Sequence, residues 1–192
     1  MKKLLTICVL VALSAGAAHA GLDPDGDSMG IYFDPAGNSN CITAGLFTPV
    51  NAYLLLANPT APTDGFGCTL TLQGGPHFVL SVLLARGGLD VDASANGYMV
   101  ATTAPYPVFA DHSELLTMSV MLQGPTPLYF FIGPNGEGTP ACRRPVVGGP
   151  GGERCCGVSS GDVLLPVASV NGAGCPVADE SSSFGAVKAL YR

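Results

Sequence analysis

The sequence predicts an all-β fold: an antiparallel β-sandwich of seven to eight strands, with a disulfide-rich loop segment and a short C-terminal helix. Three observations lead to this prediction. Only 11% of the residues are charged, and 26 glycines and 16 prolines divide the chain into short segments. Between these turn residues, apolar side chains recur at alternate positions, which is the period of a strand with one buried face. The segments also follow one another at spacings of about ten residues, as in sandwiches.

The start of the chain has the pattern of an export signal. A basic beginning precedes the apolar run 4–13, and small residues stand at the −3 and −1 positions before a cleavage after Ala20. The run is too short to span a bilayer. We therefore expect 1–20 to be a signal peptide that is removed together with Cys8. The mature protein, beginning near Gly21, is expected to be secreted to the periplasm, the cell surface or the medium.

The first expected strands are 29–34 and 48–57. The second of these is closed by Asn58-Pro59, because proline lacks the donor for a ladder hydrogen bond and favours a turn. The clearest strand pattern is 66–73, in which apolar residues alternate strictly with small or polar ones. One face of this strand is therefore expected in the core and the other in water.

The later strands follow the same logic. Segment 77–85 is apolar on both faces, as expected of a central strand that is covered on both sides. Segment 98–103 is the next expected strand. Segment 116–122 has alternating apolar residues, and 128–132 follows a Gly-Pro turn. Segment 163–170 is a possible eighth strand.

The chain is expected to form one domain, with the sandwich in 21–140 and a Cys/Gly/Pro-rich segment in 141–192. The stretch 140–158 has no periodicity, so we expect crosslinks rather than a core to hold it. At the C-terminus, three serines precede FGAVKALYR, in which Phe184, Val187 and Tyr191 recur at helical spacing. This spacing predicts a short helix that docks on the same domain.

The cysteines of the mature chain are expected to form disulfides. An even number in an exported chain favours disulfides over a metal site, and no Cys-x-x-Cys pair is present. We expect Cys41 to pair with Cys68 across adjacent strands. The vicinal pair would need a strained ring if its members were joined to each other, so one member is expected to reach Cys142 and the other Cys175. The six residues are Cys41, Cys68, Cys142, Cys155, Cys156 and Cys175.

The N-terminal arm contains the one candidate cofactor site, for calcium. Asp23, Asp25 and Asp27 stand at alternate positions, as in the start of a calcium loop, and Asp34 falls at its twelfth position. However, the sixth position is Ser28 rather than glycine, and the twelfth is not the usual bidentate glutamate. A solvated acidic arm without calcium is therefore the favoured alternative.

Three patterns raise the alternative of a hydrolase. The segment 157–161 matches Gly-x-Ser-x-Gly, but that motif needs a strand-to-helix turn in an α/β sheet. Asp111-His112-Ser113 contains triad residue types, but sequence neighbours point in different directions, so a polar turn before a strand starting near Glu114 is favoured. A glycosidase needs two carboxylates, and these could come from Asp111, Glu114 and Glu137.

The net charge limits the partners. The formal net charge is −6 and becomes −8 once Lys2 and Lys3 are removed. Such a surface is a poor partner for nucleic acid or for an anionic membrane. No segment after the signal holds the ~20 uninterrupted apolar residues of a transmembrane helix. An extracellular protein or glycan remains as the partner, although the absence of Trp makes a sugar-stacking platform less favoured.

Several segments resemble a family of uncharacterised secreted bacterial proteins: MGIYFDP, AYLLLANPT followed by GFGCTLTL, and CPVADESSSFGAVKALYR. The strand pattern of the middle part is also similar to immunoglobulin-like and cohesin-like sandwiches of bacterial extracellular proteins, without the buried Trp of true immunoglobulin domains. These resemblances imply a sandwich fold but no activity. The expected function is therefore that of a secreted, non-catalytic structural or binding protein, and the alternative is a secreted hydrolase acting on a polysaccharide or ester.

Overall fold

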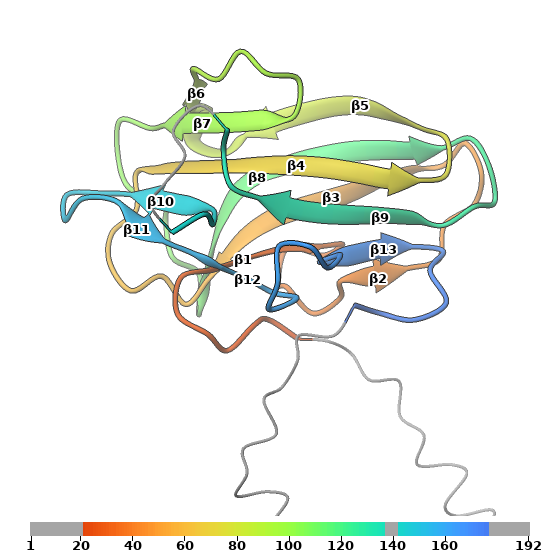
Figure 1. Cartoon of the computed structure of the whole chain (residues 1–192), viewed down its shortest axis with the longest axis horizontal. Helices are drawn as coiled ribbons and strands as arrows, with labels where there is room; N and C mark the ends of the chain where they lie inside the picture. Colours follow the sequence, from red (N-terminus) through yellow and green to blue (C-terminus); the bar gives the residue numbers. More distant parts are fainter. Residues whose placement is uncertain (1–20, 137–141, 177–192) are drawn as a thin grey trace, which may run out of the picture.

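The computed structural model describes residues 21–136 and 142–176. It confirms the all-β class: two β-sheets pack face to face, as Figure 1 shows. The one helical element in the described ranges is the 3₁₀ turn η1 (Ala85–Gly87). No helix among these residues is long and apolar enough to cross a membrane. The predicted C-terminal helix lies outside the described residues.

The first sheet has five strands in the order β12-β1-β3-β8-β5. Its pairs are antiparallel except for β1 and β12, which run parallel. Strand β5 forms one edge of this sheet. The strands are β1 (Ser28–Tyr32), β3 (Pro49–Ala57), β5 (His77–Leu84), β8 (His112–Leu122) and β12 (Gly157–Val158).

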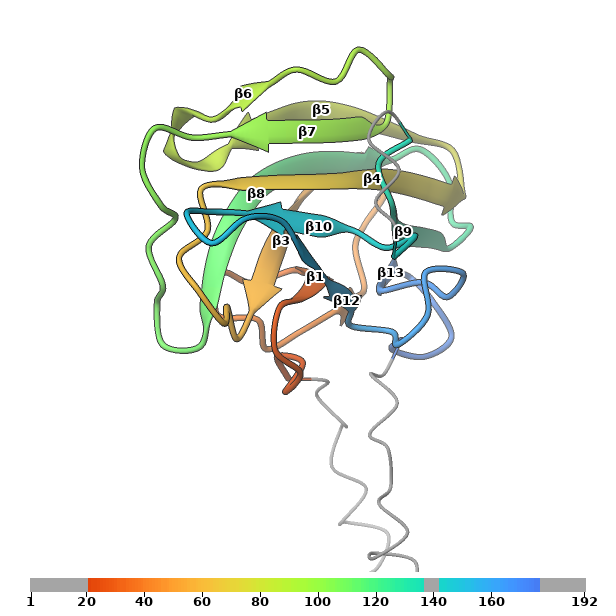
Figure 2. The same ribbon diagram turned by 60° about the vertical axis from the view of Figure 1, so that its left-hand side comes forward.

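The second sheet has eight strands, six of them in the order β11-β10-β4-β9-β13-β2. Strand β7 pairs with β4, and β6 pairs with β7. Strands β2 and β13 run parallel. The strands are β2 (Cys41–Ile42), β4 (Gly65–Gly74), β6 (Leu89–Asp90), β7 (Gly97–Ala101), β9 (Leu128–Gly133), β10 (Val146–Gly148), β11 (Arg154–Cys155) and β13 (Ala168–Val170). In Figure 2, β5, β6 and β7 lie together at one end of the sandwich.

The prediction of purely antiparallel sheets with seven to eight strands was therefore wrong. The structure has thirteen strands in the described residues, and both sheets are mixed. Six of the strands, β2, β6, β10, β11, β12 and β13, are only two or three residues long. Alternation of apolar and polar residues indicates a strand only when it continues over four to eight residues, so the hydrophobic pattern alone does not identify strands this short.

The core lies between the inner faces of the two sheets. On β8, the alternating residues Leu116, Met118, Val120 and Leu122 are at most 4% exposed. On β4, Phe66, Cys68 and Leu70 are equally buried, while the opposite face is partly solvent-accessible from Thr69 onward. The one-sided burial predicted for segment 66–73 is confirmed. Strand β8 is longer than expected, because its pairing with β3 extends back to His112, past a shift in register at Leu115.

The segment after residue 140 is more than a crosslinked loop. Val147, Cys156 and Val158 join the main core and are between 0% and 5% exposed. The chain crosses here from β11 in the eight-stranded sheet to β12 in the five-stranded sheet (Figure 1). Burial therefore holds this segment in place together with the Cys142–Cys155 disulfide.

The largest departure from the sequence prediction concerns β5. Its apolar composition predicted a central strand covered on both faces, but β5 lies at a sheet edge and pairs only with β8. Phe78 is 50% exposed and Leu83 is 66% exposed. The prediction was wrong because a continuous apolar run is typical of a buried strand. Here Val82 and Leu84 pack against the core, and the other apolar side chains of β5 face solvent.

Candidate functional site

The structure places the hydrolase candidates on separate strands. Ser159 follows β12 and donates its backbone N–H to Met29 of β1. His112 and Ser113 begin β8, and β1 and β3 lie between β12 and β8. Neighbouring strands are about 4.8 Å apart, so about 14 Å separates the two backbones. The imidazole Nε2 of His112 lies 2.8 Å from the carbonyl oxygen of Pro35. In the described structure, Ser159 and His112 are therefore too far apart to act as a nucleophile and its base.

The carboxylates proposed for a glycosidase pair have separate surroundings. Glu114 accepts a hydrogen bond of 2.6 Å from the Thr117 hydroxyl on the same strand. Asp111 is exposed in the turn before β8. Glu137 lies outside the described residues. The observed contact of Glu114 is thus local to its strand.

The acidic N-terminal arm is fixed to the sandwich by an ion pair that sequence reasoning missed. Arg154 of β11 donates to the Asp27 carboxylate from Nε at 3.0 Å and from Nη2 at 3.2 Å. The hydroxyl and backbone N–H of Thr60 donate to the same carboxylate. Burial opposes ionisation of Asp27, but the hydrogen bonds from Arg154 and Thr60 outweigh it and lower the pKa of this carboxyl. No local signal predicts the pair, because its members are 127 residues apart in sequence.

The arm's other carboxylates have local contacts or lie in solvent. Asp23 is buried and accepts hydrogen bonds from the Ser28 hydroxyl and from the backbone N–H of Asp25. Asp25 is exposed. In ranges 21–136 and 142–176, no three His, Cys, Asp or Glu residues form a group that could hold a metal ion. Calcium at Asp23, Asp25 and Asp27 stays a prediction, with two of its three carboxylates already hydrogen-bonded by protein groups.

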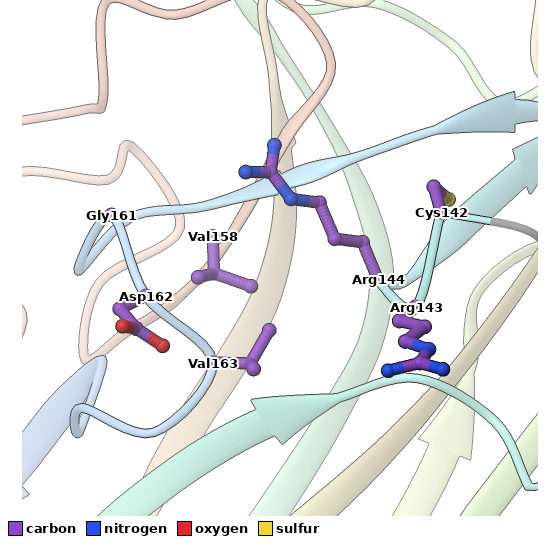
Figure 3. Close-up of a pocket in the computed structure, with 7 residues that line it drawn as sticks. All are labelled: Cys142, Arg143, Arg144, Val158, Gly161, Asp162 and Val163. Atoms are coloured by element: carbon purple, nitrogen blue, oxygen red, sulfur yellow. The ribbon is translucent and has the colours of Figure 1, made fainter.

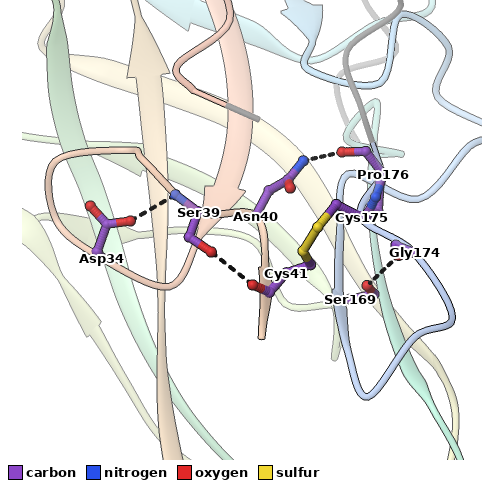
Figure 4. Close-up of a disulfide and its surroundings, with 8 residues drawn as sticks. All are labelled: Asp34, Ser39, Asn40, Cys41, Ser169, Gly174, Cys175 and Pro176. Atoms are coloured by element: carbon purple, nitrogen blue, oxygen red, sulfur yellow. Dashed lines mark hydrogen bonds between the residues drawn. A yellow bond between two sulfur atoms is a disulfide. The ribbon is translucent and has the colours of Figure 1, made fainter. Parts of the chain in front are cut away.

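Two disulfides connect distant or irregular parts of the chain. Cys41 of β2 is bonded to Cys175, with a Cα–Cα distance of 5.1 Å, and Figure 4 shows this bond beside the contact of Asn40 with Pro176. Cys142 is bonded to Cys155. The predicted Cys41–Cys68 pair was wrong because β9 and β13 lie between β2 and β4. Of the two bonds predicted for the vicinal cysteines, the one to Cys142 is confirmed and the one to Cys175 was wrong.

The expectation that all six cysteines form disulfides was wrong, because Cys68 and Cys156 are free and fully buried in the core. Burial raises the pKa of the Cys156 thiol to about 12. Burial, together with the neighbouring Cys156 and Asp90, also raises the pKa of the Cys68 thiol. Both groups are therefore held as thiols and are poor nucleophiles in the folded state.

This state of the cysteines leads to a prediction. We expect a thiol reagent to label neither Cys68 nor Cys156 in the native protein, and to label both in non-reducing denaturant. Peptide mass spectrometry after alkylation measures this. A fully oxidised protein with no reactive thiol in denaturant would contradict the prediction.

A small pocket lies beside the Cys142–Cys155 disulfide (Figure 3). Its volume is about 200 Å³, and it is lined by Arg143, Arg144, Asp162, Val158 and Val163, among others. Both arginines are exposed. Asp162 accepts a hydrogen bond from the Leu164 backbone N–H and adds a negative charge to the lining. Because this carboxylate opposes the arginines, the pocket is not a simple anion site.

The edge strand β5 is the most unusual surface of the described structure. The other outermost strands, β2, β6, β11 and β12, have two residues each, whereas β5 has eight. It contains no Asp, Glu, Lys or Arg. Natural sheets protect their edges with short strands, charged side chains, prolines or bulges, because free backbone N–H and C=O groups pair with other chains. Of these devices, β5 has one bulge, where the register with β8 passes from Val79 to Ser81.

The outer face of the five-stranded sheet continues this uncharged surface. The register aligns residues of β5, β8 and β3 in three rows across the sheet. All the residues in these rows are apolar or neutral polar, and those of β5 are exposed. The rows are Phe78–Met121–Pro49, Ser81–Ser119–Asn51 and Leu83–Thr117–Tyr53. We call β5 and these rows together the β5 surface.

No known protein family and no curated protein matches the chain. The similar solved structures include a cohesin module from a Clostridium perfringens family 33 glycoside hydrolase, with 9% identity, coverage of 67% of this chain and 88% of the module, and a TM-score of 0.42. The sixth cohesin of Acetivibrio cellulolyticus scaffoldin B, solved in complex with a Cel5 dockerin, has 12% identity, 77% and 99% coverage, and a TM-score of 0.42. A second type II cohesin module from an adaptor scaffoldin of the same organism has 12% identity, 82% and 96% coverage, and a TM-score of 0.45. These modules are of the cohesin type that the strand pattern resembles, and membership of a family of secreted bacterial proteins stays a prediction.

Proposed function

We propose that this chain is an exported, non-catalytic binding module that holds a protein partner through the β5 surface. The single observation that supports this most is the exposure of an eight-residue, uncharged edge strand in an otherwise well-protected sandwich. The two disulfides fit an oxidising compartment outside the cytoplasm. The export pattern of 1–20 supports the same location.

The mode of binding that suits this surface is strand addition. An extended segment of the partner pairs with the free backbone groups of β5, and alternate side chains of that segment lie on the outer face beside Phe78 and Leu83. The bulge at Leu80 twists the edge locally, which favours one added strand of matching register over indiscriminate stacking. Because the module is acidic, basic residues flanking the partner's strand would increase the association rate.

A proline substitution at the bulge tests the proposal. Leu80 is the extra residue of the bulge, so it has no partner residue on β8. Leu80→Pro removes a backbone donor from β5 and adds a ring at the edge, and it changes no residue that is paired with β8. A second variant at the same position, Leu80→Lys, has a matched control in Leu164→Lys, which changes an 80% exposed leucine in a loop outside the β5 surface and keeps the backbone N–H that donates to Asp162.

The probe is a fluorescent peptide of alternating valine and threonine flanked by lysines, with anisotropy as the measurement. We expect saturable binding to the mature protein and to Leu164→Lys, and at least tenfold weaker binding to Leu80→Pro. Leu80→Lys, a milder change at the same exposed position, is expected to weaken binding in the same direction. Equal affinity of wild type and both Leu80 variants would contradict strand addition at β5.

A further inference from the structure

The outer face of the eight-stranded sheet contains a second surface, a groove on the opposite sheet from β5. Its volume is about 410 Å³. One wall is the exposed loop after β12, and the floor is formed by β4 and β9. The lining residues are Thr69, Thr71, Gln73, Phe131, Gly133, Pro134, Val163 and Leu164.

The groove follows from the alternation of β4. This strand turns Phe66, Cys68 and Leu70 toward the core and therefore presents its intervening polar residues to the outside. The antiparallel register then sets a β9 residue opposite each of them: Gly133 beside Thr69, Phe131 beside Thr71, and Tyr129 beside Gln73. Polar groups of β4 and aromatic rings of β9 thus alternate across one face.

Gly133 keeps one end of this face open. A Cβ atom at this position would lie 2.7 Å from the hydroxyl oxygen of Thr69, which is closer than side-chain atoms normally approach. The glycine therefore leaves the Thr69 hydroxyl accessible from the groove. A larger residue would displace that hydroxyl or fill the space above it.

The polar groups in the groove are available for a ligand. In the described residues, the side chains of Thr69, Thr71 and Gln73 form no hydrogen bond with the protein, and neither does the side chain of Tyr129, which lies next to the lining on β9. Among the residues that the structure describes, no Asp, Glu, Lys or Arg lines the groove. Phosphates, nucleotides and metal ions need charged ligands or counter-ions, so this lining does not suit them.

Neutral hydroxyl and amide groups beside aromatic rings match the chemistry of a sugar. A pyranose ring has an apolar C–H face that packs on an aromatic ring, and hydroxyls at its rim that exchange hydrogen bonds with threonine and glutamine. Phe131 lines the groove, and Tyr129 continues the same face beyond the lining, two residues and about 6.8 Å away along β9. Two successive sugars of a chain can therefore pack along β9.

We propose that this groove binds a neutral oligosaccharide, with Phe131 and Tyr129 as the stacking surface and Thr69, Thr71 and Gln73 as hydrogen-bonding groups. The site is independent of the β5 surface, because the two belong to different sheets. A module with both sites holds a protein partner on one sheet and a glycan on the other. Loss of one function would leave the other unchanged.

Isothermal titration with defined glycans tests the proposal. The probes are cellohexaose and chitohexaose, which are neutral, and hexagalacturonate, which is acidic. We expect at least one neutral hexamer to bind the mature protein. Gln73→Ala, which removes an exposed amide without a protein partner, is expected to weaken binding at least fivefold, and Thr71→Val is expected to weaken it in the same direction. Asn51→Ala, which removes an exposed amide from the opposite sheet, is the matched control and is expected to stay within twofold of wild type.

Each other outcome contradicts the proposal. If none of the hexamers binds, the groove is not a glycan site. Binding of hexagalacturonate alone would assign the glycan to the neighbouring pocket with Arg143 and Arg144 rather than to the neutral groove. Binding that is equally weakened by Asn51→Ala, or unaffected by both Gln73→Ala and Thr71→Val, would place the sugar elsewhere.

Discussion

The loss of the Cys41–Cys175 disulfide is expected to lower the free energy of unfolding by about 5 kcal/mol. This bond closes a loop of 134 residues, which includes most of both sheets. The chain-entropy relation assigns about 5 kcal/mol to a loop of that length and about 3 kcal/mol to the 13-residue loop of Cys142–Cys155. The longer loop matters more because the crosslink removes more conformations from the unfolded chain.

Urea unfolding of two paired variants measures the difference. Cys41→Ser/Cys175→Ser is expected to be about 2 kcal/mol less stable than Cys142→Ser/Cys155→Ser. The second pair is the matched control, because it also replaces two disulfide cysteines by serine. Equal stability of the two variants, or a larger loss in the second, would show that the long loop is already constrained in the unfolded state.

Asp27→Ala is expected to cost roughly 3 kcal/mol, because it leaves the guanidinium of Arg154 without its counter-ion in a partly buried position. The Asp27 side chain is 9% exposed and that of Arg154 is 21% exposed, so solvent reduces the penalty below that of a fully buried pair. The double variant Asp27→Ala/Arg154→Met is expected to recover part of the loss, since it removes the unpaired charge. The cycle is completed by Arg154→Met. Denaturant unfolding of the three variants and the wild type measures the coupling free energy between Asp27 and Arg154.

The same ion pair predicts a dependence on pH. The pKa of Asp27 in the folded protein lies below its ordinary value of 3.8, so the folded state binds its proton less readily than the unfolded state. The stabilisation is therefore fully present above about pH 4 and is lost as the pH falls through the lowered pKa. The stability difference between wild type and Asp27→Ala should shrink in acid. A difference that is constant from pH 7 down to pH 2 would mean that the carboxylate charge is not responsible.

Local alternation in the sequence was enough to predict the sandwich. It gave the inward residues of β8 and the one-sided burial of β4, whose outer face now lines the groove. These features depend only on the period of a strand, which the residues of that strand determine. The polar face of β4 was therefore visible in the sequence, although its partner Phe131 on β9 was not assigned to it.

The features that place the candidate sites depend on distant residues and were not predicted. Arg154 reaches Asp27 across 127 residues, and Cys175 reaches Cys41 across 134. The predicted position of β5 in the sheet was wrong for a related reason. An apolar strand has the same sequence pattern whether a neighbour covers it or not, so only the strand order shows that β5 is an exposed edge.

Site-specific photocrosslinking in the secreting host tests most directly whether the β5 surface holds a protein partner. A photoreactive amino acid replaces Leu83, which is 66% exposed on the β5 surface. In the control protein the same amino acid replaces Leu164, which is 80% exposed and lies outside the β5 surface. The proposal predicts a covalent adduct of increased protein mass at position 83, absent at position 164 and lost when Leu80→Pro is added. An adduct of twice the chain's own mass would identify the partner as a second copy. Equal crosslinking at both positions, or none at position 83, would contradict the claim that β5 is the docking edge.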